Sequence, residues 1–267
     1  VCRIMAKYGQ GGDPREALQQ AEAAFRRAFE LSPQLSMAHN LYTYFEVEEQ
    51  GRSVDAMTRL LERAQSRTTD PELFAGLVLT CRFCGLLQAS AAADRRARRI
   101  DPGARTSVQY TFWMLEDWEK AMLYDEEHMR FVLHYTLPML GREAEAVARY
   151  RELEASRMPG LEHHISVSSR AALEGQRDEC VAASQIILDS SFHDPEGLMF
   201  LARNLARVNA ADAALATLER VVSGGLFCCN VLEQDPWLAP LRAQPRFTAL
   251  QQQAAAGRRR AAGAFRR

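Results

Sequence analysis

Turn-forming residues recur along this chain at a fixed spacing of 34 positions. Gly51 and Gly85 are 34 residues apart, and Gly141, Gly175 and Asn209 form a second series at the same spacing. A period of this length indicates stacked helix–turn–helix pairs. Glycine and asparagine tolerate the left-handed backbone conformation that ends the first helix of such a pair. These five residues are called the turn residues below.

A second series of small residues accompanies the first. Five positions after the turn residues stand, in order, Ala56, Ser90, Ala146, Cys180 and Ala214. We call these the crossing residues, because a small side chain here lets the second helix cross close to the first. Together the two series predict an all-α solenoid of about six helix pairs over residues 1–223, in which each pair buries its face against its neighbours.

The spacing breaks once, in the middle of the chain. Gly85 and Gly141 are 56 residues apart, which is longer than one period and shorter than two. We therefore expect a short, irregular helix pair at about residues 103–127, where Trp113 and Trp118 lie.

The end of the chain departs from the repeat. Residues 224–253 are predicted to form a non-repeat cap over the last apolar face of the stack. The candidate cap residues are Trp237, Leu241, Phe247 and Leu250. Residues 254–267 form a basic tail with five arginines. Its arginines could bind phosphate, but no aromatic base-stacking platform accompanies them, so we expect a final helical extension with a frayed, solvated end and no nucleic-acid partner.

The repeats resemble the tetratricopeptide (TPR) family over roughly residues 2–223. The matching residues on second helices and their exits are Ala21, Phe25, Ala28, Pro33, Ala146, Tyr150 and Pro159. The usual tryptophan and Leu-Gly of the first helix are mostly missing. The resemblance implies a right-handed superhelix whose first helices line a concave, partner-binding groove.

The closing segment, residues 232–247, resembles the end of TPR regions in large bacterial signalling proteins. Such regions follow serine/threonine kinase, nucleotide cyclase or winged-helix domains. The resemblance implies a protein–protein interaction scaffold, the non-catalytic regulatory or docking module of a larger signalling protein such as a serine/threonine kinase. The alternative is a small-ligand sensor domain of a bacterial transcriptional regulator.

Registering each unit on its turn residue predicts which side chains line the groove that would hold a protein or peptide. These are His39, Thr43, Arg82, Phe83, Tyr135, Arg203 and Arg207. Arg203 and Arg207 stand four positions apart on one helix, so they could clamp a carboxylate or phosphate.

Catalysis, a metal and a cofactor are not expected in this chain. Cys81 and Cys84 form a CxxC, to which Cys228 and Cys229 could add two thiolates for zinc. About 145 residues of predicted stack separate the two pairs, however, and small apolar positions account for them. Glycine-rich phosphate loops and kinase catalytic signatures are missing from the sequence.

Composition points to a folded, non-membrane protein. The net charge is −1, 47% of the residues are hydrophobic, and six cysteines are spread along the chain. Few, scattered cysteines and no apolar run of membrane-spanning length indicate reduced thiols and a cytoplasmic location. Because Val1 opens the chain within a helix-like stretch, we expect an upstream portion, and self-association through this N-terminal face is a further prediction.

Overall fold

The computed structural model describes residues 13–126, 132–156 and 160–266, and every regular element within these ranges is helical. The expected start of the first unit, residues 1–12, lies outside the described residues, as does Arg267. In chain order, the elements are α2 (Pro14–Leu31), α3 (Ser36–Tyr44), the π-helical turn η1 (Phe45–Glu49), α4 (Ser53–Ala64), α5 (Pro71–Phe83), α6 (Leu87–Ile100), α7 (Val108–Met114), α8 (Trp118–Glu126), α9 (Leu133–Thr136), the 3₁₀ turn η2 (Leu137–Leu140), α10 (Glu143–Ala155), α11 (Leu161–Leu173), α12 (Arg177–Asp189), α13 (Pro195–Arg207), α14 (Ala211–Ser223), α15 (Cys229–Gln234), the 3₁₀ helix η3 (Pro236–Leu241) and α16 (Pro245–Phe265).

The turn residues all have the left-handed conformation that their spacing predicts. Their φ angles are +65° at Gly51, +71° at Gly85, +74° at Gly141, +70° at Gly175 and +58° at Asn209. After four of them, a backbone N–H returns to a carbonyl five residues earlier, as in the 2.8 Å bond from the N–H of Leu86 to the carbonyl of Cys81. After Gly51 the N–H of Arg52 returns six residues, to the carbonyl of Glu46 at 2.9 Å, because the preceding turn η1 is π-helical. This hydrogen bond satisfies an otherwise unpaired carbonyl at the helix end.

The crossing residues are equally uniform. Ala56, Ser90, Ala146, Cys180 and Ala214 are all fully buried, each with 0% of its surface exposed. The left-handed turns are therefore confirmed, and the small residue that follows each one is buried as a close helix crossing would require.

A sixth turn of the same kind lies in the region predicted to be irregular. Glu116 has φ +60°, and the N–H of Asp117 returns to the carbonyl of Phe112 at 3.0 Å. Five positions later Ala121 is fully buried, as a crossing residue should be. The pair α7–α8 therefore follows the repeat in shortened form, and a glutamate in the left-handed position hid it from the glycine pattern.

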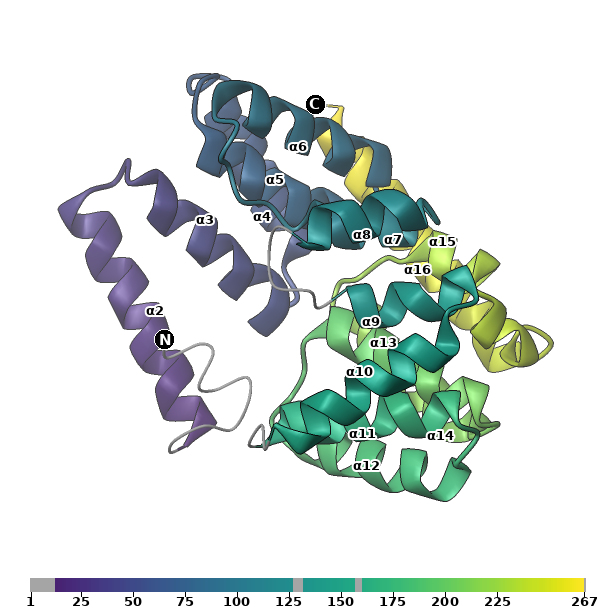
Figure 1. Cartoon of the computed structure of the whole chain (residues 1–267). Coiled ribbons are helices and arrows are strands. Elements are labelled where there is room, and N and C mark those ends of the chain that lie inside the picture. Colours follow the sequence, from purple (N-terminus) through teal and green to yellow (C-terminus); the bar gives the residue numbers. More distant parts are fainter. Residues whose placement is uncertain (1–12, 127–131, 157–159, 267) are drawn as a thin grey trace.

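Helix pairs that are neighbours in the sequence pack against each other, and the end of the chain then packs against helices from both halves of the molecule. α5 packs on α6, α11 on α12 and α13 on α14, while α3 lies against α5 and α11 against α13. Figure 1 shows α3 to α8 as one group of helices and α9 to α14 as another, with α15 and α16 running beside both. α16 contacts α4, α14 and α15, so the end of the chain joins the two groups.

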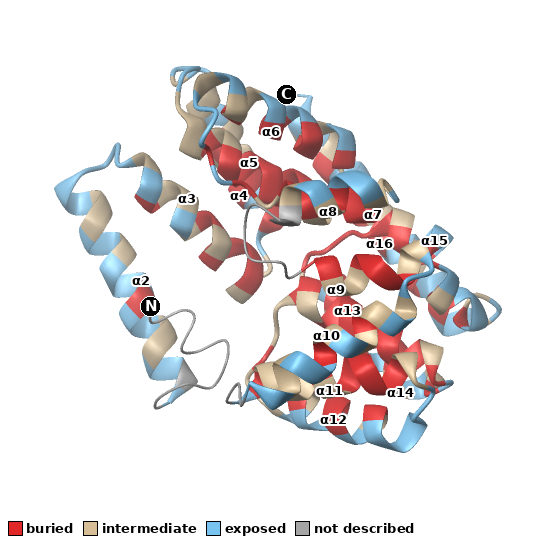
Figure 2. Cartoon of the chain, in the orientation of Figure 1, coloured by how far each residue is buried: buried red, intermediate tan, exposed pale blue. Residues whose placement is uncertain are grey.

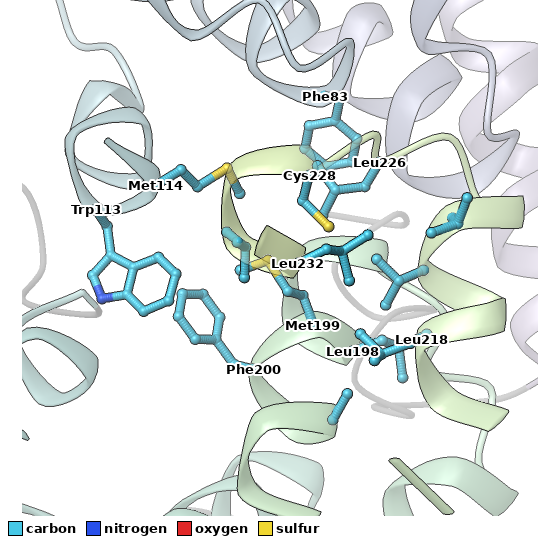
Figure 3. Close-up of a cluster of buried hydrophobic side chains, with 14 of the residues drawn as sticks. Phe83, Trp113, Met114, Leu198, Met199, Phe200, Leu218, Leu226, Cys228 and Leu232 are labelled. Atoms are coloured by element: carbon cyan, nitrogen blue, oxygen red, sulfur yellow. The ribbon is translucent and has the colours of Figure 1, made fainter. Parts of the chain in front are cut away.

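Backbone contacts secure this closure. The N–H of Phe227 donates to the carbonyl of Phe83 at 2.7 Å, and Ser53 Oγ donates to the carbonyl of Gly225 at 2.8 Å. Figure 3 shows Cys228 and Leu226 next to Phe83. The expectation that the length of the stack separates the two cysteine pairs is therefore wrong, because the segment after α14 returns to the end of α5.

Most of the predicted cap is buried where the chain closes. Leu241, Phe247 and Leu250 are at most 3% exposed, while Trp237 is partly exposed. Residues 254–265 are the second half of α16 and not a separate tail. On this half Ala254, Gly257 and Ala261 are buried, and the arginines at 258–260 are exposed.

The N-terminal helices differ from the rest in burial, as Figure 2 shows. α2 contacts the body mainly through the rings of Phe25 and Phe29, which pack on Tyr42 with centroids 5.4 Å apart in both cases. Four apolar side chains around the α2–α3 turn are 47–69% exposed: Leu31, Leu35, Met37 and Leu41.

Candidate functional site

Four of the seven predicted groove residues lie inside the molecule. Arg82 and Phe83 are 1% exposed, and Thr43 and Arg203 are 0% exposed. Their predicted place on an open groove is corrected. Arg82 pairs with Glu196 of α13, and the carbonyl of Phe83 accepts the N–H of Phe227 from the segment after α14. Arg203 lies between two tryptophan rings, and Thr43 accepts a hydrogen bond from Arg59. His39, Tyr135 and Arg207 are partly exposed.

Arg82 fastens α5 to α13. Its guanidinium makes a bidentate ion pair with Glu196, with Nε–Oε1 at 2.7 Å and Nη2–Oε2 at 3.2 Å. Nη1 also donates to the carbonyl of Ser107 at 2.9 Å. Burial raises the pKa of Glu196, and the nearby guanidinium opposes that rise. Two paired charges buried this deeply hold the groups of helices in one register, since each is costly without the other.

Arg203 lies between two tryptophan rings. Its guanidinium carbon is 4.5 Å from the centroid of Trp113 and 4.3 Å from that of Trp237, and its Nε donates to a carboxylate oxygen of Asp235. Beside these contacts lies a cavity of about 10 Å³, lined by Trp113, Asp235 and Met139 among others, which has room for about one water molecule.

The expected carboxylate clamp is occupied from within. Arg207 also lies over the Trp237 ring, with its guanidinium carbon 4.4 Å from the centroid, and pairs with Glu143 at 2.9 Å. Its Nε donates to the carbonyl of Ala172 at 3.0 Å. Asp235 and Glu143 thus supply the carboxylates that we assigned to a partner.

Tyr135, His39 and Thr43 also make internal contacts. The ring of Tyr135 stacks on Phe200 with centroids 3.9 Å apart, whereas His39 lies against Phe29 at the far end of the molecule. Thr43 Oγ1 accepts a hydrogen bond from Arg59 at 2.9 Å. The seven predicted residues are therefore not gathered at one surface.

Arg59 was not identified from the sequence. It pairs with buried Glu46 on η1, with Nη2–Oε2 at 2.6 Å, and its own side chain is 25% exposed. The two residues are 13 positions apart across a helix turn, a separation that no helical spacing rule marks.

The described thiols are buried and free of disulfides. Burial raises the pKa of both Cys84 and Cys228 to about 12, so they are protonated at neutral pH. A thiol in this state is a poor nucleophile and metal ligand. Within the described ranges, no three His, Cys, Asp or Glu side chains are placed to hold a metal ion.

A pocket that the sequence did not indicate opens between α6, α15 and α16. Its volume is about 400 Å³. It is lined by Gly85, Leu86, Leu87, Gln88, Ala89, Leu115, Asn230, Arg258, Ala262, Phe265 and Arg266. We call it the α6–α16 pocket. A second, more open depression of about 620 Å³ lies over the α2–α3 and α4–α5 turns and is lined mainly by polar residues, including Ser36, Arg67 and Asp70.

Comparison with known proteins does not identify a family for this chain. Among the residues that the structure describes, no helix is both long and apolar enough to cross a membrane. No protein-family model matches the chain, and no curated protein matches it significantly.

Proposed function

We propose that this chain is a TPR-like helical repeat scaffold for protein–protein interaction. The observation that carries the proposal is the repeated turn: six times, a residue with positive φ is followed five positions later by a fully buried small residue. A repeated supersecondary unit of this kind builds a right-handed superhelix whose helix faces present long surfaces for partners.

The closure of the chain changes where a partner would bind. In an open superhelix the first helices line the binding groove, but here α5 and α13 face each other across Arg82 and Glu196. The inner faces of α5 and α13 are therefore buried against each other and are not open to a partner. A partner would bind the outer surfaces, which carry the α6–α16 pocket and the exposed side chains of α2 and α3.

The setting that we propose is a docking or regulatory module within a larger bacterial signalling protein, such as a serine/threonine kinase. This part rests on the resemblance of residues 232–247 to the ends of such repeat regions. In the structure this segment includes η3 and Trp237, which stacks on both Arg203 and Arg207. The segment is thus built into the body, as a capping element of a repeat module would be.

The experiment that tests the scaffold is capture followed by reconstitution. Tagged full chain is incubated with bacterial lysate at physiological salt, and proteins enriched over an unrelated helical protein are purified and titrated by calorimetry. The proposal expects a defined complex with a dissociation constant in the micromolar range or below. If no enriched protein forms a complex when purified, the scaffold proposal fails.

A further inference from the structure

We propose that the α6–α16 pocket binds a segment of a protein partner that carries a carboxylate next to an apolar side chain. The inference rests on the proposed scaffold function and deepens it, because it names one surface and the chemistry of what docks there.

The pocket has the size and the lining of a binding site. Its volume of about 400 Å³ falls in the range of about 300–1,000 Å³ that is typical of ligand sites. Leu86, Leu87, Leu115 and Phe265 supply apolar surface from three different parts of the chain. Phe265 is 39% exposed, so an aromatic ring is available at the edge of the pocket.

The charge of the pocket has one sign. Arg258 and Arg266 both line it, both are exposed, and no carboxylate is among the lining residues. The last acidic residue of the sequence is Asp235, and all seven charged residues after it are arginines. A carboxylate on the partner would therefore meet two guanidinium groups without competition from an acidic side chain of the pocket.

Arg258 is held in position by the closure of the chain. A Cβ placed on Gly85 would lie 3.4 Å from both Cγ and Cδ of Arg258, so the stem of the arginine packs along the Gly85 backbone. Packing of the stem restricts the side chain and so reduces the entropy lost on binding.

The combination of charge and apolar wall favours a peptide over a phosphate-bearing ligand. Free phosphate would use the guanidinium groups but leave the leucine and phenylalanine surface without a partner. A nucleic acid could stack a base on Phe265 but would leave the surface of Leu86, Leu87 and Leu115 without one. Arginine and aromatic residues are also the side chains on which protein interfaces concentrate binding energy. A carboxylate beside a leucine or phenylalanine matches both halves of the pocket.

The test measures binding of two fluorescein-labelled peptides of about ten residues by fluorescence anisotropy. In one peptide, leucine and phenylalanine alternate with aspartate and glutamate; in the other, asparagine and glutamine replace the acidic residues. The full chain is compared with a pocket variant, Arg258→Gln with Arg266→Gln. The matched control, Arg259→Gln with Arg260→Gln, removes the same charge from exposed positions of α16 outside the lining set.

The expected result is that the acidic peptide binds and the amide peptide binds at least about tenfold more weakly. The pocket variant should lose about tenfold or more in affinity, and the control variant less than about twofold. Equal losses in both variants would show diffuse charge attraction and overturn the pocket, as would equal binding of the two peptides or no binding of either. A partner from the capture experiment that binds the pocket variant with unchanged affinity would keep the scaffold proposal and refute this inference alone.

Discussion

Helices α2 and α13 are buried to very different extents. α2 has 18 residues, and Ala21 is its one buried side chain among those described. α13 has 13 residues, of which eleven are buried, including Glu196 and Arg203. The difference comes from the chain end, because α15, η3 and α16 return to cover the central helices and leave α2 uncovered (Figure 2).

This contrast separates two sources of stability. Local turns shape every helix pair, whereas contacts distant in sequence decide which pairs become a core. Arg82 and Glu196 are 114 positions apart, and Ser53 and the Gly225 carbonyl are 172 apart. Mutations that test the closure should therefore cost much more free energy of unfolding than matched mutations in α2.

The largest effect is expected from Arg203→Ala. It leaves the Asp235 carboxylate buried without its partner and removes the cation between two indole rings. We expect a loss of about 3–5 kcal/mol in the free energy of unfolding. Urea denaturation followed by tryptophan fluorescence measures it, because Trp113 and Trp237 flank the site.

Arg207→Ala is the matched control, since its side chain is 24% exposed and pairs with a half-exposed Glu143. We expect it to cost about 1 kcal/mol or less. Equal costs at the two arginines would contradict the view that the closed interior depends on Arg203.

Two phenylalanines allow the same substitution to be made in the closed interior and in α2. Phe247→Ala on α16 removes a fully buried ring and should cost about 3–4 kcal/mol. Phe25→Ala on α2 removes a ring that is only partly buried, against Tyr42 and Phe45, and should cost about 1 kcal/mol. Thermal and urea unfolding by circular dichroism provide both values, and similar losses would show that α2 is part of the cooperative core.

Much of the local structure could be predicted from the sequence, because the turns and helix crossings depend on residues that are close together in the chain. A left-handed turn favours glycine or asparagine, and a close crossing favours a small side chain, so residues such as Gly175 and Cys180 mark both features. Glu116 was missed because glutamate has no intrinsic preference for the left-handed conformation, so its residue type does not mark the turn.

The candidate site could not be predicted in the same way. The groove prediction assumed an open stack, and nothing in the helical periodicity shows that residue 227 returns to residue 83. The arginines at 258–260 were interpreted as part of a solvated terminus and not of a pocket, because the apolar face that anchors α16 consists of the inconspicuous Ala254, Gly257 and Ala261. Where closure brings distant segments together, sequence patterns of one segment carry no information about the other.

Substitutions at two turn glycines separate the stability contribution of the local turn from that of the contacts with the end of the chain. Gly85 and Gly175 have nearly equal φ angles, +71° and +70°. A Cβ at Gly85 would lie 2.5 Å from the Phe227 carbonyl oxygen, whereas nothing lies within 4 Å at Gly175. We expect Gly85→Ala to cost about 2–3 kcal/mol and Gly175→Ala about 1 kcal/mol.

Urea denaturation of both variants measures this difference. Both variants lose the unfolding free energy that corresponds to the strain of an alanine with positive φ. The additional loss at Gly85 measures the cost of displacing the segment that contains Phe227. If the two costs were equal, the contact between Phe227 and the end of α5 would contribute nothing to stability.

The smallest effect is expected at the ion pair between His193 and Glu49. His193 Nε2 lies 2.7 Å from Glu49 Oε2 and joins the start of α13 to η1. The Glu49 carboxylate raises the pKa of His193 above its usual value, and Asp194 adds to this rise, while burial opposes it. The protonated imidazolium is thus the form that the folded chain prefers.

A histidine with a raised pKa stabilises the fold while it is protonated. The contribution is complete below the unfolded pKa of about 6.5 and is lost as the pH rises through the higher folded value. Burial lowers the pKa of His39 and His164, which has the opposite sign and destabilises the fold as the pH falls. The informative quantity is therefore the difference in unfolding free energy between the native chain and His193→Gln, measured at each pH.

That difference should be under about 1 kcal/mol, because the His193 side chain is 38% exposed and solvent screens the pair. It should be complete below the unfolded pKa of about 6.5 and shrink as the pH rises through the higher folded pKa. Glu49→Gln should remove the same pH dependence, since it takes away the charge that raises the pKa of His193. A difference that does not change with pH would mean that the two side chains only hydrogen-bond, and that the closure of the helix groups has no electrostatic contribution at this position.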